Sequence, residues 1–264
     1  MVAFSQSRII ASRFSAKLAF SSALLLAVSL VVAPNSVAHQ PVNLTNADSK
    51  VNQSPILADG MVSWAVYANF TKASQNRYFR FALAEGERLK AEYLIFDRSP
   101  DNSLKNSRLP IVSMKSPSGK SIRLAINERS KFFEPFGGQR YLFLSRINQI
   151  GEAGVYTVTI RSRGAATAIV AVGVNEVRGE VIKIGSQSGD CPAPLQEEIA
   201  IPQESASQLI GLTKRSAEIC AQVNGWLYRV GEEDGEQFAL TRDYRINRIT
   251  VSIKSGRITN VLVG

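Results

Sequence analysis

The sequence contains a single histidine, His39, among 264 residues, and only two cysteines. A Ser-His or Cys-His nucleophilic site needs an imidazole beside the nucleophile, and a histidine-based metal centre needs more than one such ring. The shortage of histidine therefore argues against most hydrolase chemistry. Ser-Lys chemistry is the remaining enzymatic alternative, but no Gly-x-Ser-x-Gly or Ser-x-x-Lys segment is placed to support it. We expect a protein that is not an enzyme and that uses no cofactor.

Only one long apolar run is present, near the start of the sequence. Three basic residues precede an apolar run over 18–33, and Ser36-Val37-Ala38 supplies small residues for cleavage. This order is typical of a secretory signal peptide, so we predict a signal peptide over 1–38 and a secreted or periplasmic mature chain. An uncleaved membrane anchor is the alternative, although the run is slightly shorter than the ~20 residues that span a bilayer. No membrane span is expected after cleavage.

The charge of the sequence is modestly basic. It has 31 Lys and Arg against 22 Asp and Glu, a net charge of +9, and loss of the three basic residues of the signal would leave +6. The basic residues are scattered, without the clustered stripe or aromatic-interleaved patch that nucleic-acid-binding proteins carry. We therefore expect no nucleic-acid partner.

The two cysteines, Cys191 and Cys220, predict one structural feature. Export into an oxidising compartment favours a single disulfide between them. Such a bridge would stabilise the fold by roughly 3 kcal/mol through the lost entropy of the unfolded chain. A reactive thiol is the alternative interpretation.

The N-terminal half reads as a polar segment followed by short strands. Residues 39–58 are rich in Asn, Ser and Gln, which favours a flexible leader. From 59 to 185, apolar-alternating runs are separated by turn residues, without helical periodicity. The candidate strands are 62–70, 78–83, 89–96, 111–114, 121–126, 141–144, 154–160, 168–174 and 180–184. So many short strands predict an antiparallel β-sandwich, of jelly-roll type.

Three short motifs in this region carry a resemblance. They are Tyr78-Phe79-Arg80-Phe81, Ser116-Pro117-Ser118-Gly119 and Gly154-Val155-Tyr156-Thr157-Val158. The region resembles the accessory β domains of exported bacterial proteins in the galactose-binding-like or pre-peptidase C-terminal class. The resemblance implies the fold class alone.

Aromatic and acidic residues of the sandwich are candidates for ligand binding. The aromatic residues Trp64, Tyr67, Phe79 and Phe81 are candidates for a sugar platform, but aromatics on alternating strands favour a place in the core. Oxygen ligands for calcium are candidates too, in Asp97, Asp101, Glu128 and Glu134. No dense Asp/Asn/Gly loop surrounds them, so solvated loops are the favoured interpretation and we predict no metal site.

The C-terminal quarter predicts a small α+β unit. Residues 186–204 are rich in Gly, Pro and polar residues, which indicates a linker. In 205–264, Thr213 is a plausible N-cap for a helix over 214–223 that Asn224-Gly225 would end. The apolar residues Ala217, Ile219, Cys220 and Val223 give this helix a buried face. Strands are expected over 226–230, 246–253 and 258–263, with a long polar loop over 231–244.

This unit contains an ordered set of motifs. They are Leu209-Ile210-Gly211, the helix, the strand over 227–230, Thr241-Arg242-Asp243, Tyr244-Arg245-Ile246-Asn247-Arg248, and a final Val263-Gly264. In this order they resemble the potato inhibitor I family of serine-protease inhibitors. The resemblance implies a potato inhibitor I-like domain over 205–264, whose partner is a trypsin-like or subtilisin-like serine protease.

The family resemblance also implies residue roles. Arg242 takes the place of the primary-specificity residue, so the reactive bond would be Arg242-Asp243, flanked by Leu240, Tyr244 and Arg245. Arg248 would hydrogen-bond Thr241 and Asp243 from below. Plant members use a second bracing arginine two positions later, where this chain has Thr250. The loop is also longer than in the family, by part of Gln237-Phe238-Ala239.

The physical reason for such bracing is general. A loop that enters a protease cleft in the form of a substrate binds tightly only if little ordering entropy is lost, so it must be held beforehand. An arginine beneath the loop can hold a carboxylate and a hydroxyl together with its planar set of donors. Two alternatives stay open. The segment 241–248 is an ordinary loop-to-strand junction, or the chain is a non-catalytic glycan-binding or cell-surface β-sandwich protein with the C-terminal unit as a scaffold.

Overall fold

The computed structural model of the protein describes residues 39–194 and 200–264. The predicted signal peptide lies outside the described residues, as do residues 195–199 of the predicted linker. Within the described ranges, no helix is both long and apolar enough to cross a membrane. The domain boundaries at 185 and 205 stay predictions.

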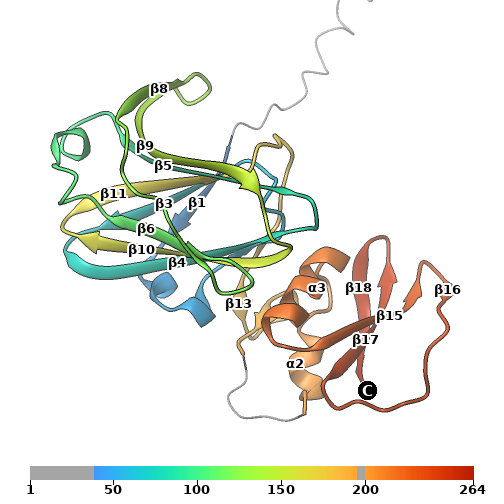
Figure 1. Ribbon diagram of the computed structural model, residues 1–264. Coiled ribbons are helices and arrows are strands. Elements are labelled where there is room, and N and C mark those ends of the chain that lie inside the picture. Colours follow the sequence, from blue (N-terminus) through green and yellow to red (C-terminus); the bar gives the residue numbers. More distant parts are fainter. Residues whose placement is uncertain (1–38, 195–199) are drawn as a thin grey trace, which may run out of the picture. The chain divides into compact units, whose positions relative to one another are not determined.

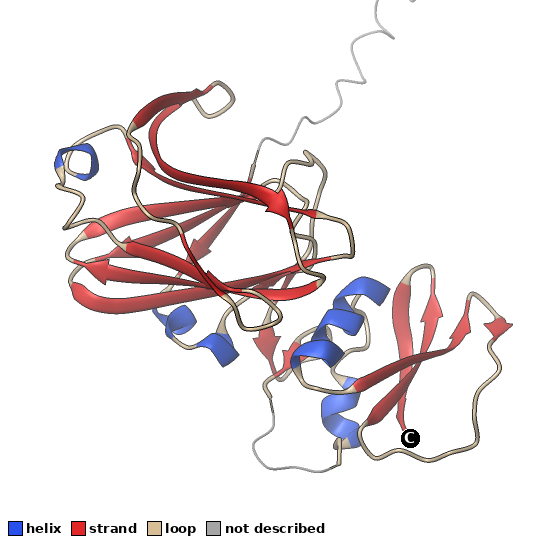
Figure 2. Cartoon of the chain, in the orientation of Figure 1, coloured by secondary structure: helices blue, strands red, loops and turns tan. Residues whose placement is uncertain are grey.

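Residues 40–182 form two six-stranded sheets (Figures 1 and 2). The first has the order β1(Gln40–Leu44), β3(Trp64–Phe70), β11(Ala166–Val172), β5(Arg88–Phe96), β9(Gln139–Ile150) and β8(Ser130–Glu134). The second has the order β12(Val181–Ile182), β2(Ile56–Leu57), β4(Ala73–Leu83), β10(Gly154–Arg163), β6(Ile111–Lys115) and β7(Ser121–Arg123). The predicted β-sandwich is therefore confirmed.

The core lies between the inner faces of the two sheets. In β10, buried Tyr156, Val158 and Ile160 alternate with half-buried threonines, as a strand with one covered face requires. Phe81 of the neighbouring strand β4 stacks on Tyr156 with 5.0 Å between ring centroids. The first sheet contributes smaller apolar side chains, among them Val66, Ala168 and Val170. The first sheet also contributes the large buried rings of Trp64 and Tyr93, so aromatic and aliphatic side chains from both sheets fill the interior.

The aromatic residues that were candidates for a sugar platform divide between core and surface. Trp64, Phe79 and Phe81 are at most 2% exposed, so the interpretation as core residues is confirmed for these three. The indole nitrogen of Trp64 donates to the carbonyl oxygen of Asp59 at 2.8 Å, which satisfies its one polar group. Tyr67 differs, because it points away from the core and is half-buried on the outer face of the first sheet.

The segment predicted as a flexible leader instead belongs to the sandwich, so that prediction is wrong. β1 pairs in parallel with β3, and β2 pairs in parallel with β4. Two short 3-10 helices join these strands, η1(Asn46–Ser49) and η2(Val51–Gln53). Leu44, Ile56 and Leu57 are buried in the core, and their burial outweighs the polar composition around them. The sandwich is consequently mixed rather than purely antiparallel.

The C-terminal part contains the predicted helix. α3(Lys214–Val223) begins after Thr213, whose hydroxyl accepts from the backbone nitrogen of Ser216 at 3.2 Å. It ends at Asn224 and Gly225, whose φ of 71° is the left-handed conformation that favours glycine. A shorter helix, α2(Gln203–Ser207), was not predicted and occupies the end of the expected linker.

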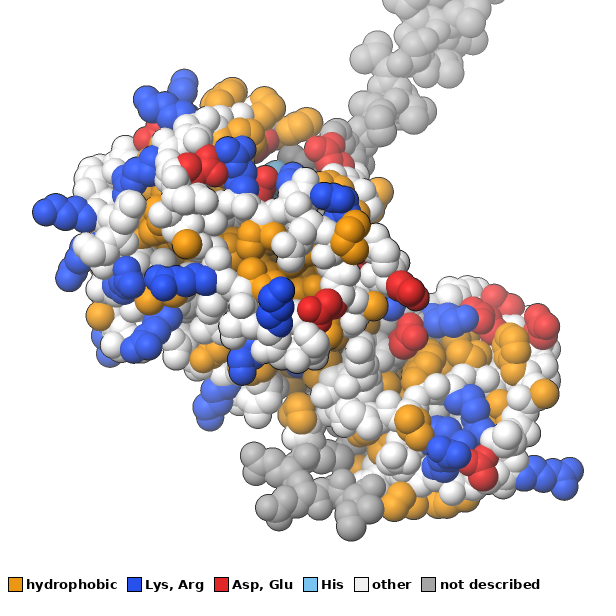
Figure 3. Space-filling model, in the orientation of Figure 1, with side chains coloured by type: hydrophobic (Ala, Val, Ile, Leu, Met, Phe, Trp, Pro, Cys, Tyr) orange, Lys and Arg blue, Asp and Glu red, His pale blue; other side chains and the backbone are white. Residues whose placement is uncertain are grey.

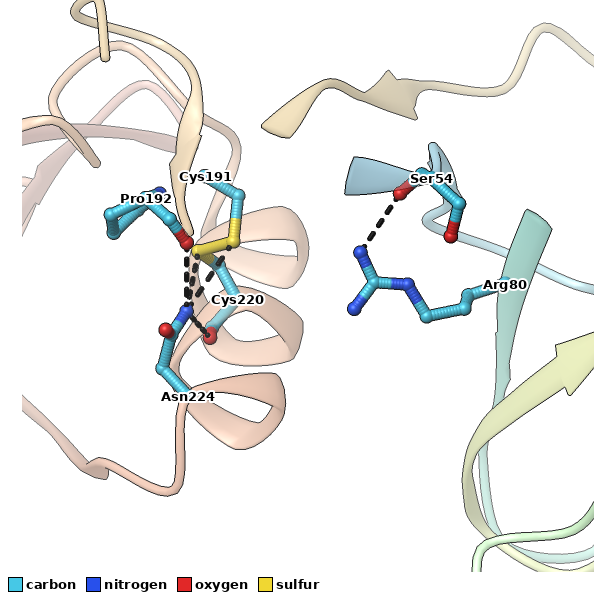
Figure 4. Close-up of a disulfide and its surroundings, with 6 residues drawn as sticks. All are labelled: Ser54, Arg80, Cys191, Pro192, Cys220 and Asn224. Atoms are coloured by element: carbon cyan, nitrogen blue, oxygen red, sulfur yellow. Dashed lines mark hydrogen bonds between the residues drawn. A yellow bond between two sulfur atoms is a disulfide. The ribbon is translucent and has the colours of Figure 1, made fainter. Parts of the chain in front are cut away.

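The predicted disulfide is present between Cys191 and Cys220 (Figure 4). It ties β14(Cys191–Pro192), which pairs with β13(Ile184–Gly185), to the middle of α3. The side-chain amide of Asn224 donates to the carbonyl oxygens of Pro192 at 3.2 Å and Cys220 at 3.0 Å. The bridge therefore fixes the expected linker to the helix that follows it.

A four-stranded sheet completes the C-terminal part. Its order is β16(Glu236–Gln237), β15(Leu227–Glu233), β17(Arg248–Lys254) and β18(Arg257–Val263). β15 and β17 run parallel, while the two edge strands are antiparallel to their neighbours. Buried Ile249, Val251 and Ile253 of β17 belong to the same cluster as Ala217 and Cys220 of α3. A helix packed on one face of a small sheet is the α+β arrangement that was predicted.

The surface carries charges of both signs. On the face drawn in Figure 3, Lys and Arg side chains are scattered over the sandwich among uncharged groups. Acidic and basic side chains lie near one another on the C-terminal part (Figure 3).

Candidate functional site

The segment between β15 and β17 is a wide, exposed loop because of how the two strands pair. Parallel neighbours run in the same direction, so the chain leaving Glu233 must return the length of the sheet, about 23 Å for seven residues, before β17 begins. Figures 1 and 2 show this return as a long excursion from β16 to β17. Every residue from 234 to 247 is exposed.

The first part of the return is a hairpin, not the irregular loop that was predicted from 231 onward. Asp234 and Gly235 have φ values of 51° and 90°, which suit a tight two-residue turn, and β16 then pairs with the end of β15. Gly231 is the extra residue of a β-bulge in β15, and its carbonyl oxygen accepts from the backbone nitrogen of Phe238 at 3.0 Å. The free loop therefore begins near residue 238.

The far end of the loop is also held by backbone hydrogen bonds. The carbonyl oxygen of Ile246 accepts from the nitrogen of Ile201 at 2.9 Å, and that of Asn247 accepts from the nitrogen of Leu227 at 2.9 Å. Residues 238–247, which we call the braced loop, thus span two fixed ends. Between those ends, the described hydrogen bonds come from side chains, apart from the one that the carbonyl oxygen of Arg245 accepts from the backbone nitrogen of Arg248 at 3.0 Å.

Asp243 lies at the centre of these side-chain contacts. Its carboxylate accepts from the hydroxyl of Thr241, from Nε of Arg245 at 2.6 Å and from Nη1 of Arg248 at 3.1 Å. The Thr241 hydroxyl, followed by the two guanidinium groups, holds the pKa of Asp243 well below its usual range. The carboxylate is therefore ionised whenever the loop has this arrangement.

Arg248 is the buried support beneath the loop. It is the first residue of β17 and only 7% exposed, and its Nη2 donates to the carbonyl oxygen of Asp243. Its Nε donates to the carbonyl oxygen of Gly264 at 3.1 Å. One planar group thus binds both the main chain and the side chain of Asp243, a use for which the fork of arginine donors is suited.

A second arginine, Arg229 of β15, lies beside this site. Its Nε and Nη2 donate to the hydroxyl of Thr250 at 3.1 and 2.9 Å. Its Nη1 is 3.4 Å from both the carbonyl oxygen and the hydroxyl of Thr241. Arg229 was missed from the sequence because it lies on a different strand from the expected arginine pair. Its register partner on β17 is Thr250, the position where plant family members carry their second arginine.

Arg242 is exposed between these supports. Among the described residues, no hydrogen bond or salt bridge involves its side chain, in contrast to both of its neighbours in sequence. The flanking side chains Phe238, Leu240 and Ile246 are about two-fifths exposed, and Tyr244 is 72% exposed. The loop therefore presents one cation among several apolar groups.

Each predicted site residue can now be located. Arg248 contacts Asp243 as the resemblance implied, but the described hydrogen bonds connect Thr241 to Asp243 and Arg229 rather than to Arg248. Leu240 and Tyr244 lie on the exposed loop, and Arg245 contacts Asp243. The roles of these residues in inhibition, and the reactive bond at Arg242-Asp243, stay predictions.

A cleft on the outer face of the first sheet is a second candidate site. A small apolar cluster of Ala65, Leu94, Tyr141, Ile169 and Ala171 lies on this face, opposite the sandwich core. The rings of Tyr67, Phe96, Phe132 and Phe143 pack around it, and the β8–β9 hairpin supplies Phe132 and Phe143. The cleft has a volume of about 230 Å³.

The cleft has polar groups at its rim. Lys90 and Glu92 form a salt bridge of 3.6 Å there, and Glu134 and His39 also line it. The hydroxyls of Tyr67 and Tyr141 lie 3.2 Å apart. Burial, followed by this hydrogen bond, raises the pKa of Tyr141. The Tyr141 phenol consequently keeps its proton and can donate a hydrogen bond in the cleft.

The acidic residues that were candidate calcium ligands have other partners. Glu128 accepts from Arg146 at 2.8 and 2.7 Å, and Asp101 accepts from the backbone nitrogen of Thr167 at 2.9 Å. Glu134 accepts from two backbone nitrogens of its own turn, and Asp97 accepts from the amide of Asn102 at 3.1 Å. Each carboxylate therefore has a hydrogen-bond partner in the protein, but Asp101 is only 5% exposed, so the interpretation as a solvated loop residue is wrong for Asp101.

Comparisons with known proteins give little that bears on function. No known protein family matches the sequence, and no curated protein matches it. Among solved structures, the chain is similar to the pre-peptidase C-terminal domain of a collagenase from Bacillus anthracis, with 8% identity, 52% of this chain and 99% of that chain covered, and a TM-score of 0.27. It is also similar to a family GH115 4-O-methyl-α-glucuronidase with specificity for decorated arabinogalactans, with 14% identity, 55% of this chain and 19% of that chain covered, and a TM-score of 0.27. Because both TM-scores are below 0.5, neither likeness carries an argument about this chain.

Proposed function

We propose that the C-terminal part of this chain inhibits a serine protease by presenting the braced loop as a substrate, with the reactive bond Arg242-Asp243. The observation that carries the proposal is the contrast between adjacent residues. Arg242 has a free, exposed side chain, while Asp243 is held through both its carboxylate and its carbonyl oxygen by Arg248. A loop ordered in this way loses little conformational entropy on binding.

The chemistry of the loop suggests the class of protease. An exposed guanidinium suits a specificity pocket with an acid at its base, as trypsin-like enzymes have. Leu240 precedes Arg242 by two positions and Tyr244 follows it by two, so both would meet subsites beside that pocket. The exposed apolar rings and chains favour a protease with apolar subsites there.

The proposal is tested by titration of trypsin-like and subtilisin-like enzymes with the purified chain. We expect stoichiometric, slowly reversible inhibition of a trypsin-like enzyme. Arg242→Glu should abolish this inhibition, and Arg242→Lys should retain most of it. Arg215→Glu is the matched control, because Arg215 is an exposed arginine of α3 away from the loop. Equal inhibition by the Arg242→Glu variant, or rapid complete cleavage after Arg242, would contradict the proposal.

A second function is favoured by the cleft on the sandwich. Its aromatic rings and phenol hydroxyls, with charged groups only at the rim, suit a sugar ring, which has both apolar faces and hydroxyl edges. The volume of about 230 Å³ is below that of most drug-sized sites, so the cleft would enclose one ring-sized group. On this view the sandwich attaches the inhibitor to a glycan-bearing surface.

This second candidate is tested on a glycan array with the full chain, with and without calcium. Binding should be lost in Tyr67→Ala and in Phe132→Ala. Phe136→Ala is the control, because Phe136 is 62% exposed at the tip of the β8–β9 hairpin and does not line the cleft. Absence of binding to every sugar would remove this candidate and leave the inhibitor proposal untouched.

A further inference from the structure

Arg229 is fixed beneath the braced loop by hydrogen bonds to oxygen atoms of Thr250 and Gly264. It is the register partner of Thr250 in the parallel pair of β15 and β17, so the two side chains lie side by side. Two of its nitrogens donate to the hydroxyl of Thr250, and Nη2 is also 3.3 Å from the carbonyl oxygen of Gly264. That hydroxyl in turn lies 3.2 Å from the same carbonyl oxygen. A planar guanidinium held at two nitrogens has its third nitrogen aimed in one direction.

The third nitrogen is aimed at Thr241. Nη1 of Arg229 lies 3.4 Å from the carbonyl oxygen and 3.4 Å from the hydroxyl of this residue. These distances are at the long end for N–H···O hydrogen bonds, so the contact is weaker than those with Thr250. None of the described salt bridges involves Arg229. Because the guanidinium is a cation, each hydrogen bond that it donates to the Thr250 and Thr241 oxygens is charge-assisted.

The two arginines hold opposite sides of the same peptide bond. Arg248 binds Asp243, the residue after the proposed reactive bond, and Arg229 contacts Thr241, which precedes Arg242. We infer that Arg229 is a second positioning residue, which holds the Thr241 side of the loop as Arg248 holds the Asp243 side. This inference rests on the proposed function. It also accounts for the threonine at position 250, whose hydroxyl fixes the direction of Arg229.

It matters after cleavage that a different arginine holds each side of the reactive bond. Hydrolysis breaks the bond between the carbonyl carbon of Arg242 and the nitrogen of Asp243. The oxygen of water joins the new carboxylate, and hydrogen joins the new amine. Resynthesis, catalysed by the same serine protease, reverses these changes and needs both ends to stay adjacent. If only Arg248 held the loop, the end that terminates at Arg242 would move away.

The inference is tested by moving the arginine between strands in the full chain. The variants are Arg229→Thr, Arg229→Lys, Thr250→Arg and the double variant Arg229→Thr/Thr250→Arg, with Arg215→Thr on α3 as the matched control. NMR order parameters of the backbone at residues 240–242 in the free protein report loop order without any protease. The equilibrium ratio of cleaved to intact protein, reached with catalytic trypsin, reports resynthesis.

We expect Arg229→Thr to lower these order parameters, and to raise the ratio of cleaved to intact protein by about tenfold. Arg229→Lys should recover little of this, because a lysine lacks the fork of donors, while the double variant should recover most of it. Arg215→Thr should change neither quantity. Unchanged order parameters in Arg229→Thr would overturn the inference. If no protease is inhibited but the order parameters respond as expected, the proposed function fails while the bracing by Arg229 stands.

Discussion

The sandwich core and the braced loop both hold aromatic or charged side chains in defined positions, but by different means. Phe81 and Tyr156 are positioned by burial, with almost no exposed surface and stacked rings. Arg242 and its neighbours are exposed, and Thr241 and Asp243 are positioned by hydrogen bonds to Arg229 and Arg248. Burial contributes about 25 cal/mol for each Å² of apolar surface, which an exposed loop cannot use.

This difference explains why the arginines that hold the loop lie beneath it. A loop that must remain accessible to a partner cannot be ordered by covering it, so it is ordered from beneath by groups that are themselves buried. Arg248 is 7% exposed, while the side chain of Asp243 is 39% exposed. Hydrogen bonds to a charged group contribute about 1.5–3 kcal/mol when shielded from water, and exposed ion pairs contribute less than 1. The ordering of the loop therefore depends on its buried arginine more than on Arg245.

The strongest way to break the comparison is a change in the core. Phe81→Ala should lower the free energy of unfolding by about 3–5 kcal/mol, because it leaves a cavity beside Tyr156 and removes a stacked pair. Urea unfolding followed by the fluorescence of Trp64 measures this. Phe136→Ala, at an exposed position, should change the same quantity by less than about 0.5 kcal/mol. Similar effects of both changes would mean that burial does not order the sandwich.

Removal of the disulfide should lower the stability of the C-terminal part and leave that of the sandwich unchanged. Cys191→Ser/Cys220→Ser should destabilise the C-terminal part by about 3–4 kcal/mol, because the bridge closes a loop with a separation of 29 residues. The two tryptophans of the chain lie in different regions, so a Trp64→Phe background lets the fluorescence of Trp226 report the C-terminal part alone. The unfolding midpoint of Trp226 should fall while that of Trp64, followed in a Trp226→Phe background, stays unchanged. Equal shifts at both tryptophans would show that the regions unfold together.

Regular elements were predictable from the sequence where the chain follows one periodic pattern. The helix over 214–223 has its capping threonine, its apolar face and its terminal glycine in local sequence, and its bounds agree with α3. Most strands of the sandwich were found from their alternation, although β9 and β4 are longer than predicted and β8 was not predicted. β1 and β2 were missed because they are short, lie among polar residues and pair in parallel with strands of the sandwich.

The candidate site was predictable only where its residues are close in sequence. Thr241, Asp243 and Arg248 lie within one motif, and their mutual contacts follow from it. Arg229 belongs to another strand, and its approach to Thr241 depends on the parallel register of β15 and β17, which a single sequence does not specify. The aromatic cleft was missed for the same reason, because Tyr67, Phe132 and Tyr141 come from separate strands.

Replacement of the buried Arg248 tests whether it orders the loop more than the exposed Arg245 does. Arg248→Met keeps most of the side-chain volume but leaves Asp243 and the carbonyl oxygen of Gly264 without their donor. We expect the ordered arrangement of the loop to be destabilised by about 1.5–3 kcal/mol, seen as lower NMR order parameters of the backbone at residues 243–245. Arg245→Met should have a smaller effect, because the ion pair of Arg245 is exposed. A larger effect at Arg245 would contradict the role given to burial.

The smallest expected effect is the response of the loop to acid. Because the pKa of Asp243 is lowered in the folded state, its contribution is present above the usual value of 3.8 and is lost only as the pH falls toward the lower folded value. The NMR order parameters of the braced loop should therefore stay constant from pH 8 to pH 4. Carboxyl-carbon NMR measures the titration of Asp243 directly. The Thr241 hydroxyl and Arg248 both lower the pKa of Asp243, so Thr241→Val and Arg248→Met should each raise it. A loop that loses order while Asp243 is still ionised would show that the carboxylate is not what orders it.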